Sequence, residues 1–169
     1  RALIPGVEGG EGLPAHVLLL HFIVVLAPLT AILAILCAVW PAARQRLVWL
    51  VLALAAITAV LTPLTTEAGE WLEHRVEESA LLEAHTELGD TMIYFSLGLL
   101  VVAVLLAVQH LRAGRGKTVP MALTAVVTVL TVLVGVATVV QVYRIGDSGA
   151  KATWGDKPLV ATSSGGPGE

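Results

Sequence analysis

The sequence predicts an all-α integral membrane protein, an antiparallel bundle of four transmembrane helices. The first observation is composition: 56% of the 169 residues are hydrophobic, only 14% are charged, and the mean hydropathy is +0.85. A soluble domain of this length could not bury so much apolar surface. The second is a set of apolar runs that approach or exceed the ~20 residues a helix needs to cross ~30 Å of hydrocarbon. The four predicted spans lie at about residues 15–40, 47–66, 88–110 and 118–143.

The first span is expected to be retained as a membrane helix. It lacks the basic leading region and the small-residue cleavage pattern of a signal peptide, and it is long for the apolar part of one. The spans together form one membrane domain, residues 15–143. Outside the hydrocarbon we expect an amino-terminal segment 1–14, an acidic helical connection 67–87 and a carboxy-terminal tail 144–169.

The distribution of charge, a third observation, predicts the orientation. The connection between the first two spans carries Arg44 and Arg46, the one between the last two carries Arg112, Arg115 and Lys117, and neither contains an acid. Basic residues in short loops favour the cytoplasmic side. The chain is therefore expected to be a multi-pass protein of the plasma membrane with both termini outside. The region between the second and third spans, with the start of the third, has only one arginine, Arg75, and eight carboxylates. These are Glu67, Glu70, Glu73, Glu77, Glu78, Glu83, Glu87 and Asp90.

Histidines gather at the outer ends of the predicted spans. His16 and His21 lie near the start of the first span, and His85 lies just before the third. Two neutral imidazoles on different helices can coordinate haem b between them. The candidate haem ligands are His85 with either His16 or His21. A transition metal such as zinc or copper is the alternative, with His21, Asp90 and Glu87 as its candidate ligands.

The spacing also predicts an ionisable pair inside the membrane. His21 lies five residues deeper than His16, and Asp90 five deeper than His85, a step of about 7.5 Å along a helix in each case. If His16 and His85 share one level, His21 and Asp90 share a deeper one. Ionisable groups in a membrane seldom face lipid and usually find a partner, so a contact between His21 and Asp90 is expected. The simpler alternative places His16 and His85 in headgroup water.

No catalytic motif accompanies these residues. Cys37 is the only cysteine, which excludes an intrachain disulfide, a C-x-x-C-H haem attachment and a cysteine-ligated cluster. The Glu-x-x-His pair of di-iron bundles is missing, as are H-E-x-x-H, G-x-x-x-x-G-K and G-x-S-x-G. No catalytic residue is therefore assigned. Four tryptophans flank the spans, where anchoring at the membrane interface is their simplest role: Trp40, Trp49, Trp71 and Trp154.

Four outer segments together resemble a known family. They read "LPAHVLLLHFIVVLAPL", "TTEAGEWLEHR", "LLEAHTELGD" and "YRIGDSGAKATWG", and they look like the actinobacterial branch of the membrane family catalogued as domain of unknown function 2231. The similarity runs from about residue 12 to 155. It implies a four-span bundle, and because some members carry this module beside Rieske or cytochrome domains, it implies a redox setting by association.

The resemblance also marks particular positions. The family commonly has G-H-S-G-A in the tail, where this chain has "GDSGA", so Asp147 stands in place of a potential ligand. The family's recurrent polar positions fall on His16, His21, Glu70, His85, Asp90, Arg144, Gly149 and Trp154.

The tail is expected to fold back over the outer mouth of the bundle. Gly146 and Gly149 permit turns with positive φ, and Arg144 is expected to pair with a carboxylate there, either Glu70, Glu73 or Asp90. The predicted structural cap of the outer end comprises Glu70, Arg144, Gly149 and Trp154.

Three classes of function remain open. The first is a membrane-embedded, redox-associated module with a histidine-based site, for haem b or a metal, at the outer leaflet. The second is a non-catalytic accessory subunit of a respiratory or other membrane complex, whose apolar faces pack on partner helices or on a second copy. The third, a proton-coupled transporter using His21 and Asp90, is disfavoured because four spans without an evident repeat offer little pathway. The expected partners are lipid and other membrane subunits, and nucleic acid is not among them.

Overall fold

A computed structural model of the chain describes residues 12–73 and 80–154, and every element in these two ranges is an α-helix. Four stretches are long and apolar enough to cross a membrane, namely Leu19–Val39, Pro41–Glu70, Ala80–Gly114 and Met121–Ala152. The predicted all-α class with four spans is thus confirmed. The helices are α1 (Gly12–Val39), α2 (Pro41–Glu73), α3 (Ala80–Asp90), α4 (Met92–Gly114) and α5 (Met121–Trp154).

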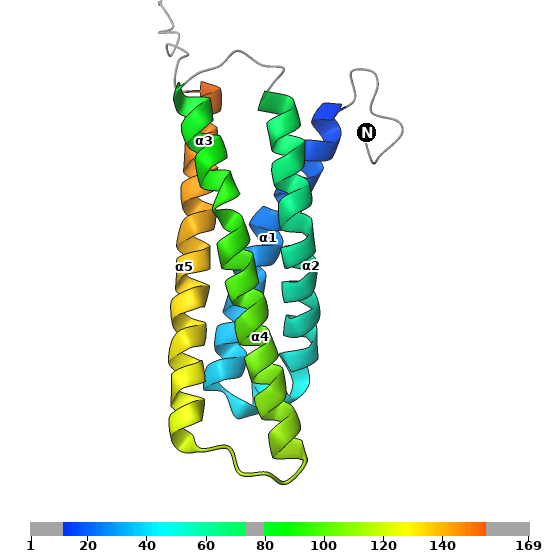
Figure 1. The fold of residues 1–169 in the computed structure, drawn as a ribbon, viewed down its shortest axis with the longest axis vertical. Helices are drawn as coiled ribbons and strands as arrows, with labels where there is room; N and C mark the ends of the chain where they lie inside the picture. Colours follow the sequence, from blue (N-terminus) through cyan, green and yellow to red (C-terminus); the bar gives the residue numbers. More distant parts are fainter. Residues whose placement is uncertain (1–11, 74–79, 155–169) are drawn as a thin grey trace, which may run out of the picture.

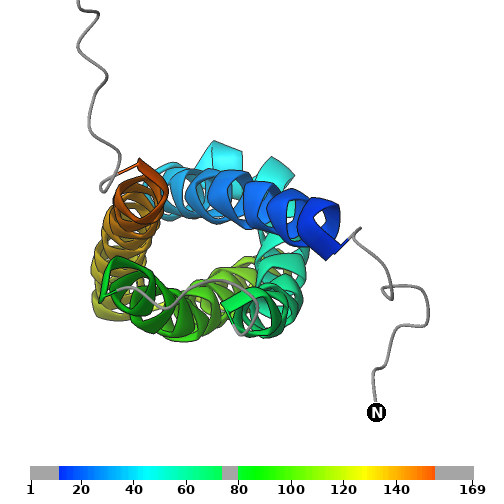
Figure 2. The ribbon, with the colours of Figure 1, turned by 90° about the horizontal axis from the view of Figure 1, so that it is seen from above.

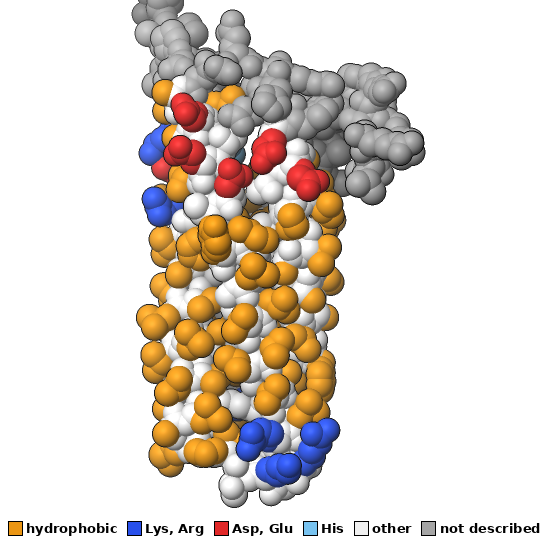
Figure 3. All heavy atoms as spheres, viewed as in Figure 1, with side chains coloured by type: hydrophobic (Ala, Val, Ile, Leu, Met, Phe, Trp, Pro, Cys, Tyr) orange, Lys and Arg blue, Asp and Glu red, His pale blue; other side chains and the backbone are white. Residues whose placement is uncertain are grey.

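The spans form a ring of helices that run alternately down and up the long axis (Figure 1). Seen along that axis, α1 lies beside α2 and α5, and the span built from α3 and α4 closes the ring between them (Figure 2). Figure 3 shows an apolar belt with acidic side chains above it and Lys and Arg side chains at the foot of α2 and α4. We call the upper end, with Glu67, Glu70, Glu83, Glu87 and Asp90, the acidic end, and the lower end, with Arg44, Arg46, Arg112, Arg115 and Lys117, the basic end.

The two connections at the basic end are short. Only Trp40 separates α1 from α2, and its N–H donates to the Leu36 carbonyl at 2.9 Å. Pro41 then opens α2, where a residue without an N–H and with a fixed φ suits the first helical turn. The stretch predicted to connect the first two spans therefore belongs almost entirely to α2. Between α4 and α5 the chain turns at Gly116, whose φ of 68° favours glycine.

Helices at the acidic end extend beyond their predicted limits. α5 continues to Trp154, so the backbone at Gly146 and Gly149 is helical, and the prediction that residues 144–154 turn back over the bundle is wrong. The physical reason is tertiary: α3 packs along this part of α5 and stabilises it as helix. The remainder of the predicted tail, 155–169, and the amino-terminal residues 1–11 lie outside the described ranges.

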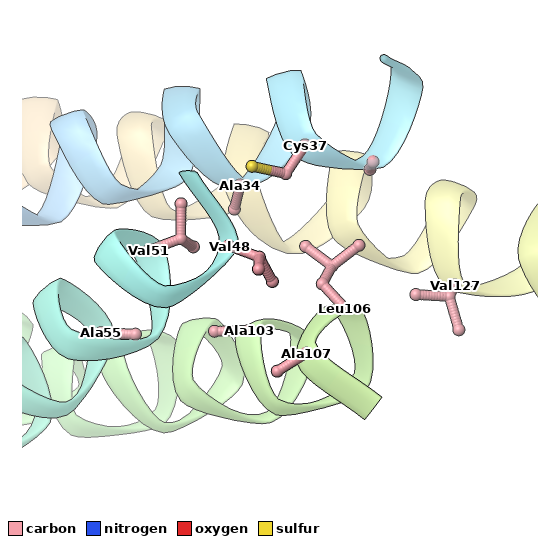
Figure 4. Close-up of a cluster of buried hydrophobic side chains, with 10 residues drawn as sticks. Ala34, Cys37, Val48, Val51, Ala55, Ala103, Leu106, Ala107 and Val127 are labelled. Carbon is pink, nitrogen blue, oxygen red and sulfur yellow. The ribbon is translucent and has the colours of Figure 1, made fainter. Parts of the chain in front are cut away.

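Small side chains bring the spans together. In the half of the core nearer the basic end, α1, α2 and α4 contribute alanines, valines and Cys37, which allow close approach of their backbones (Figure 4). Gly135 on α5 has the same role, because a Cβ built there would lie 2.7 Å from the Ile35 Cδ1 atom and 3.4 Å from the Ala31 carbonyl. A second cluster fills the half nearer the acidic end and consists of Ile23, Ala27, Met92 and Val142, flanked by Leu61, Phe95 and Ile145.

Hydroxyl groups also lie in the core, most of them bonded to their own helix. Thr58 donates to the Leu54 carbonyl at 2.8 Å, and Thr131 donates to the Val127 carbonyl at 2.7 Å. Such back-bonding satisfies a hydroxyl without any partner on another helix. The fully buried residues that bond in this way are Thr58, Thr62, Ser96, Thr131 and Thr138, whereas the hydroxyl of the fully buried Thr30 has no partner among the described residues.

We expect Gly135→Leu to lower the stability of the detergent-purified protein by about 1–3 kcal/mol, because overpacking must displace Ile35 and the backbone of α1. Thermal unfolding measures the change. Gly146→Leu is the matched control, since an added Cβ there meets nothing within 4 Å. It should keep or raise the melting temperature, glycine being a poor helix former. An equal loss in both variants would contradict the close approach of α1 and α5.

Candidate functional site

The regular helix of the third span is interrupted for one residue near the acidic end, at Thr91 between α3 and α4, whose φ of -69° and ψ of -14° remain in the right-handed helical region. The Thr91 hydroxyl donates to the Leu88 carbonyl at 2.7 Å. From α5, the Gln141 Nε2 atom donates to the Thr91 Oγ1 atom at 2.7 Å and to the Leu88 carbonyl at 3.2 Å. Only 4% of Gln141 is exposed. A single buried amide therefore supplies donors to the break from the neighbouring span.

His85 fastens α3 to α5 one level further out. Its Nδ1 atom lies 2.9 Å from the Ser148 Oγ atom, and its ring is half-buried. A Cβ at Gly149 would lie 3.0 Å from the His85 Cε1 atom, so the absence of a side chain there lets the imidazole lie against α5. The resemblance marked both His85 and Gly149, and the structure brings them together as a contact between two helices.

The hydrogen-bond geometry at Ser148 bears on the tautomer of His85. The Ser148 Oγ atom is also 2.9 Å from the Ile145 carbonyl, and a hydroxyl has only one hydrogen to donate. When that hydrogen goes to the carbonyl, Nδ1 of a neutral His85 carries its proton and donates to Ser148. The Nε2 atom then keeps its lone pair, as the imidazole of a metal ligand does when a second group holds its other nitrogen.

Charged residues on α5 take other partners than those predicted. The Arg144 Nη1 atom lies 3.5 Å from the Gln141 Oε1 atom, and neither Glu70 nor Asp90 forms an ion pair with it, while the side chain of Glu73 lies outside the described set. Asp147, in the place of the family's histidine, pairs instead with Lys151 at 2.6 Å on the exposed surface. The predicted pairing of Arg144 with a carboxylate is thus wrong for these two acids.

The other predicted ligands do not form one site in the described ranges. His21 is exposed on α1, which is not a neighbour of α3 in the bundle, and α3 carries Glu87 and Asp90 as exposed side chains. No ion pair joins His21 to Asp90. Among the residues that the structure describes, no three of the His, Cys, Asp and Glu side chains are grouped closely enough to hold a metal ion. His16 and Trp154 lie in α1 and α5, but their side chains are outside the described set.

Sequence reasoning missed the residues that hold this end together. Gln141 is an amide within an otherwise apolar run, and a polar side chain in such a position is expected to have a partner. The position of Gln141 in the sequence therefore indicates a contact with another helix. Ser148 and Thr91 had no comparable signal, because serine and threonine are common in membrane helices and their partners depend on how α3 lies on α5.

These features define a class: a small integral membrane protein whose four spans are fastened at one end by neutral polar contacts between its third and fourth spans. The chain belongs to the family described as "Predicted membrane protein (DUF2231)", whose sequence profile matches residues 12–162. The resemblance to that family is confirmed over nearly the whole chain. No curated protein and no solved structure gives a significant match.

We expect Gln141→Leu to destabilise the bundle by about 1–3 kcal/mol, because both hydrogen bonds from α5 to the third span, to the Thr91 hydroxyl and to the Leu88 carbonyl, are lost. Thermal unfolding in detergent tests this. Gln45→Leu, the same substitution at an exposed position of α2, is the control and should leave the melting temperature nearly unchanged. If the two variants behave alike, Gln141 does not support the break.

Proposed function

We propose that this protein is a non-catalytic, membrane-embedded accessory subunit of a larger complex in the plasma membrane. The observation that carries the proposal is the use made of the polar side chains between the spans. Gln141 and His85 each join α5 to the third span. Both side chains therefore hold helices in fixed positions. A side chain with this structural role suits a scaffold better than a catalyst, whose polar groups must be available to a substrate.

The outward faces of the spans support the same proposal. Most of each span lies at the surface of the bundle, and α5 is the most open of them, with 22% of its span buried. Its outward side chains include Val126, Leu133 and Val140, each more than half exposed. Apolar side chains of this kind pack equally well against lipid and against a partner helix, and close helix packing in a membrane depends on such contacts.

We also propose that the basic end faces the cytoplasm and the acidic end faces outward, on the strength of the charge asymmetry. Two glycines allow a matched test in a Cys37→Ala background. Gly114 and Gly146 are both exposed, lie at opposite ends, and have nothing within 4 Å of an added Cβ. On intact cells, a membrane-impermeant thiol reagent should label Gly146→Cys and spare Gly114→Cys. The reverse pattern would invert the proposed orientation.

A second candidate function is a haem b redox module, and His85 is the observation that favours it. With Nδ1 held by Ser148, the imidazole presents Nε2 as a haem ligand would. The described residues define the surroundings of one ligand only, His85. The second ligand would come from α1, where His21 is exposed and the side chain of His16 lies outside the described set. The fit is therefore partial. When bound, the haem would supply one-electron exchange.

One preparation separates the two functions. Protein purified from its native membrane in a mild detergent should copurify with other membrane proteins in a fixed ratio and show no Soret band if it is an accessory subunit. A reducible Soret band that His85→Ala removes, and that His110→Ala at the opposite end leaves intact, would replace this proposal by the haem module. A lone, colourless protein would contradict both.

A further inference from the structure

The basic end of the bundle has cations without anions. It holds five basic residues, while residues 12–66 and 91–146, which form this end and the apolar belt, contain no Asp or Glu. The carboxylates of the described chain lie toward the other end of the bundle (Figure 3). Where the dielectric constant is low, a cation is stabilised strongly by a nearby anion, and charged side chains there are usually paired. The described residues supply none at this end.

Arg44 of α2 bonds residues of two other helices at this end. Its Nε atom donates to the Cys37 carbonyl at 3.0 Å, and its Nη2 atom donates to the Ala38 carbonyl at 3.3 Å, so the guanidinium covers the carboxyl end of α1. A cation is favourable there because of the helix dipole. Its Nη1 atom donates to the Gln109 Oε1 atom of α4 at 3.0 Å. All three acceptors are neutral.

Hydrogen-bond donors exceed acceptors around Arg44. A guanidinium has five N–H groups, and the three bonds above leave two of them for another acceptor. Gln109 is only 4% exposed, and its Nε2 atom has no partner among the described residues. A buried donor without an acceptor is destabilising. This end is thus short of acceptors, and an anionic oxygen is the group that would supply them.

The surroundings place the missing acceptor at the membrane interface. Trp49 of α2 and His110 of α4 meet edge to face, with ring centroids 6.2 Å apart, and half of Trp49 is exposed. Tryptophan prefers the headgroup level of the membrane. Arg46 lies one turn from Trp49, and Arg112 lies one turn from Gln109 on the same face of α4. Apolar side chains of the same two helices, including Leu50 and Val108, continue toward the membrane centre.

We propose that the basic end binds the headgroup phosphate of an anionic phospholipid at the junction of α2 and α4. Arg44 contributes its unused N–H groups, and the exposed Arg46 and Arg112 contribute charge at the rim. The acyl chains lie along the apolar faces of α2 and α4, which a free phosphate could not use. Basic pockets between membrane helices recognise anionic headgroups in this way.

Lipid titration of the purified full-length protein tests the proposal. Phosphatidylglycerol should raise the melting temperature and remain bound in native mass spectra, whereas phosphatidylcholine with the same chains should do neither. Each basic residue near an anionic surface contributes about 1 kcal/mol, so Arg46→Gln combined with Arg112→Gln should weaken phosphatidylglycerol binding about tenfold or more. The matched control is Arg144→Gln with Lys151→Gln, which removes two cations from the acidic end and should leave the affinity unchanged.

A second variant tests the role of Arg44 without removing a cation. Gln109→Glu places a carboxylate beside the guanidinium, so it should reduce the stabilisation by phosphatidylglycerol to a small fraction of the wild-type shift. The proposal is overturned if both double variants lose affinity equally, since net charge alone would then explain binding. It is also overturned if Gln109→Glu leaves the shift intact, or if inorganic phosphate at the same concentration stabilises the protein as well as the lipid does.

Discussion

The structure depends on one constraint: a polar group in the membrane must find its partner within the protein. A continuous helix meets this constraint for its backbone, and the described chain is helical except at Trp40, at Thr91 and in the turn at residues 115–120. The difficulty arises where a helix ends or breaks. At the break between α3 and α4, Gln141 of α5 donates in addition to the hydroxyl of Thr91 itself, and at the end of α1 the donors come from Arg44 of α2. In both places, a backbone carbonyl of one span accepts a hydrogen bond from a side chain of another span.

This arrangement explains why the spans hold a fixed register. Gln141 can reach Thr91 only if α5 and the third span keep their present depth, and Arg44 can reach Cys37 and Ala38 only if the turn at Trp40 stays tight. The contacts lie near opposite ends of the bundle, while small residues such as Gly135 set the distance between helices in the middle. Apolar packing brings the helices together, and the polar contacts select one alignment among many of similar packing energy.

The two ends use different chemistry. At the acidic end, neutral groups join the helices and the carboxylates remain outside on exposed surface, where they keep their water. At the basic end a guanidinium is drawn into the junction of the helices, and its charge faces carbonyl and amide oxygens. Desolvating a charge is costly unless it is well paired. The described contacts of the acidic end thus join neutral groups, whereas those of the basic end hold a charge among neutral acceptors.

The sequence by itself determined the class, the number of spans and the separation of charge, because hydrophobic length and composition are local properties that no packing alters. The family resemblance also singled out His85 and Gly149, but it did not predict that they contact each other. Tertiary structure decided where α5 ends, that His85 contacts Ser148, and that His21 and Asp90 do not form a pair. Those outcomes depend on the rotation and tilt of each helix, which many weak side-chain contacts set jointly. Spacing along the chain fixes depth in the membrane, but it leaves open which neighbour a side chain faces.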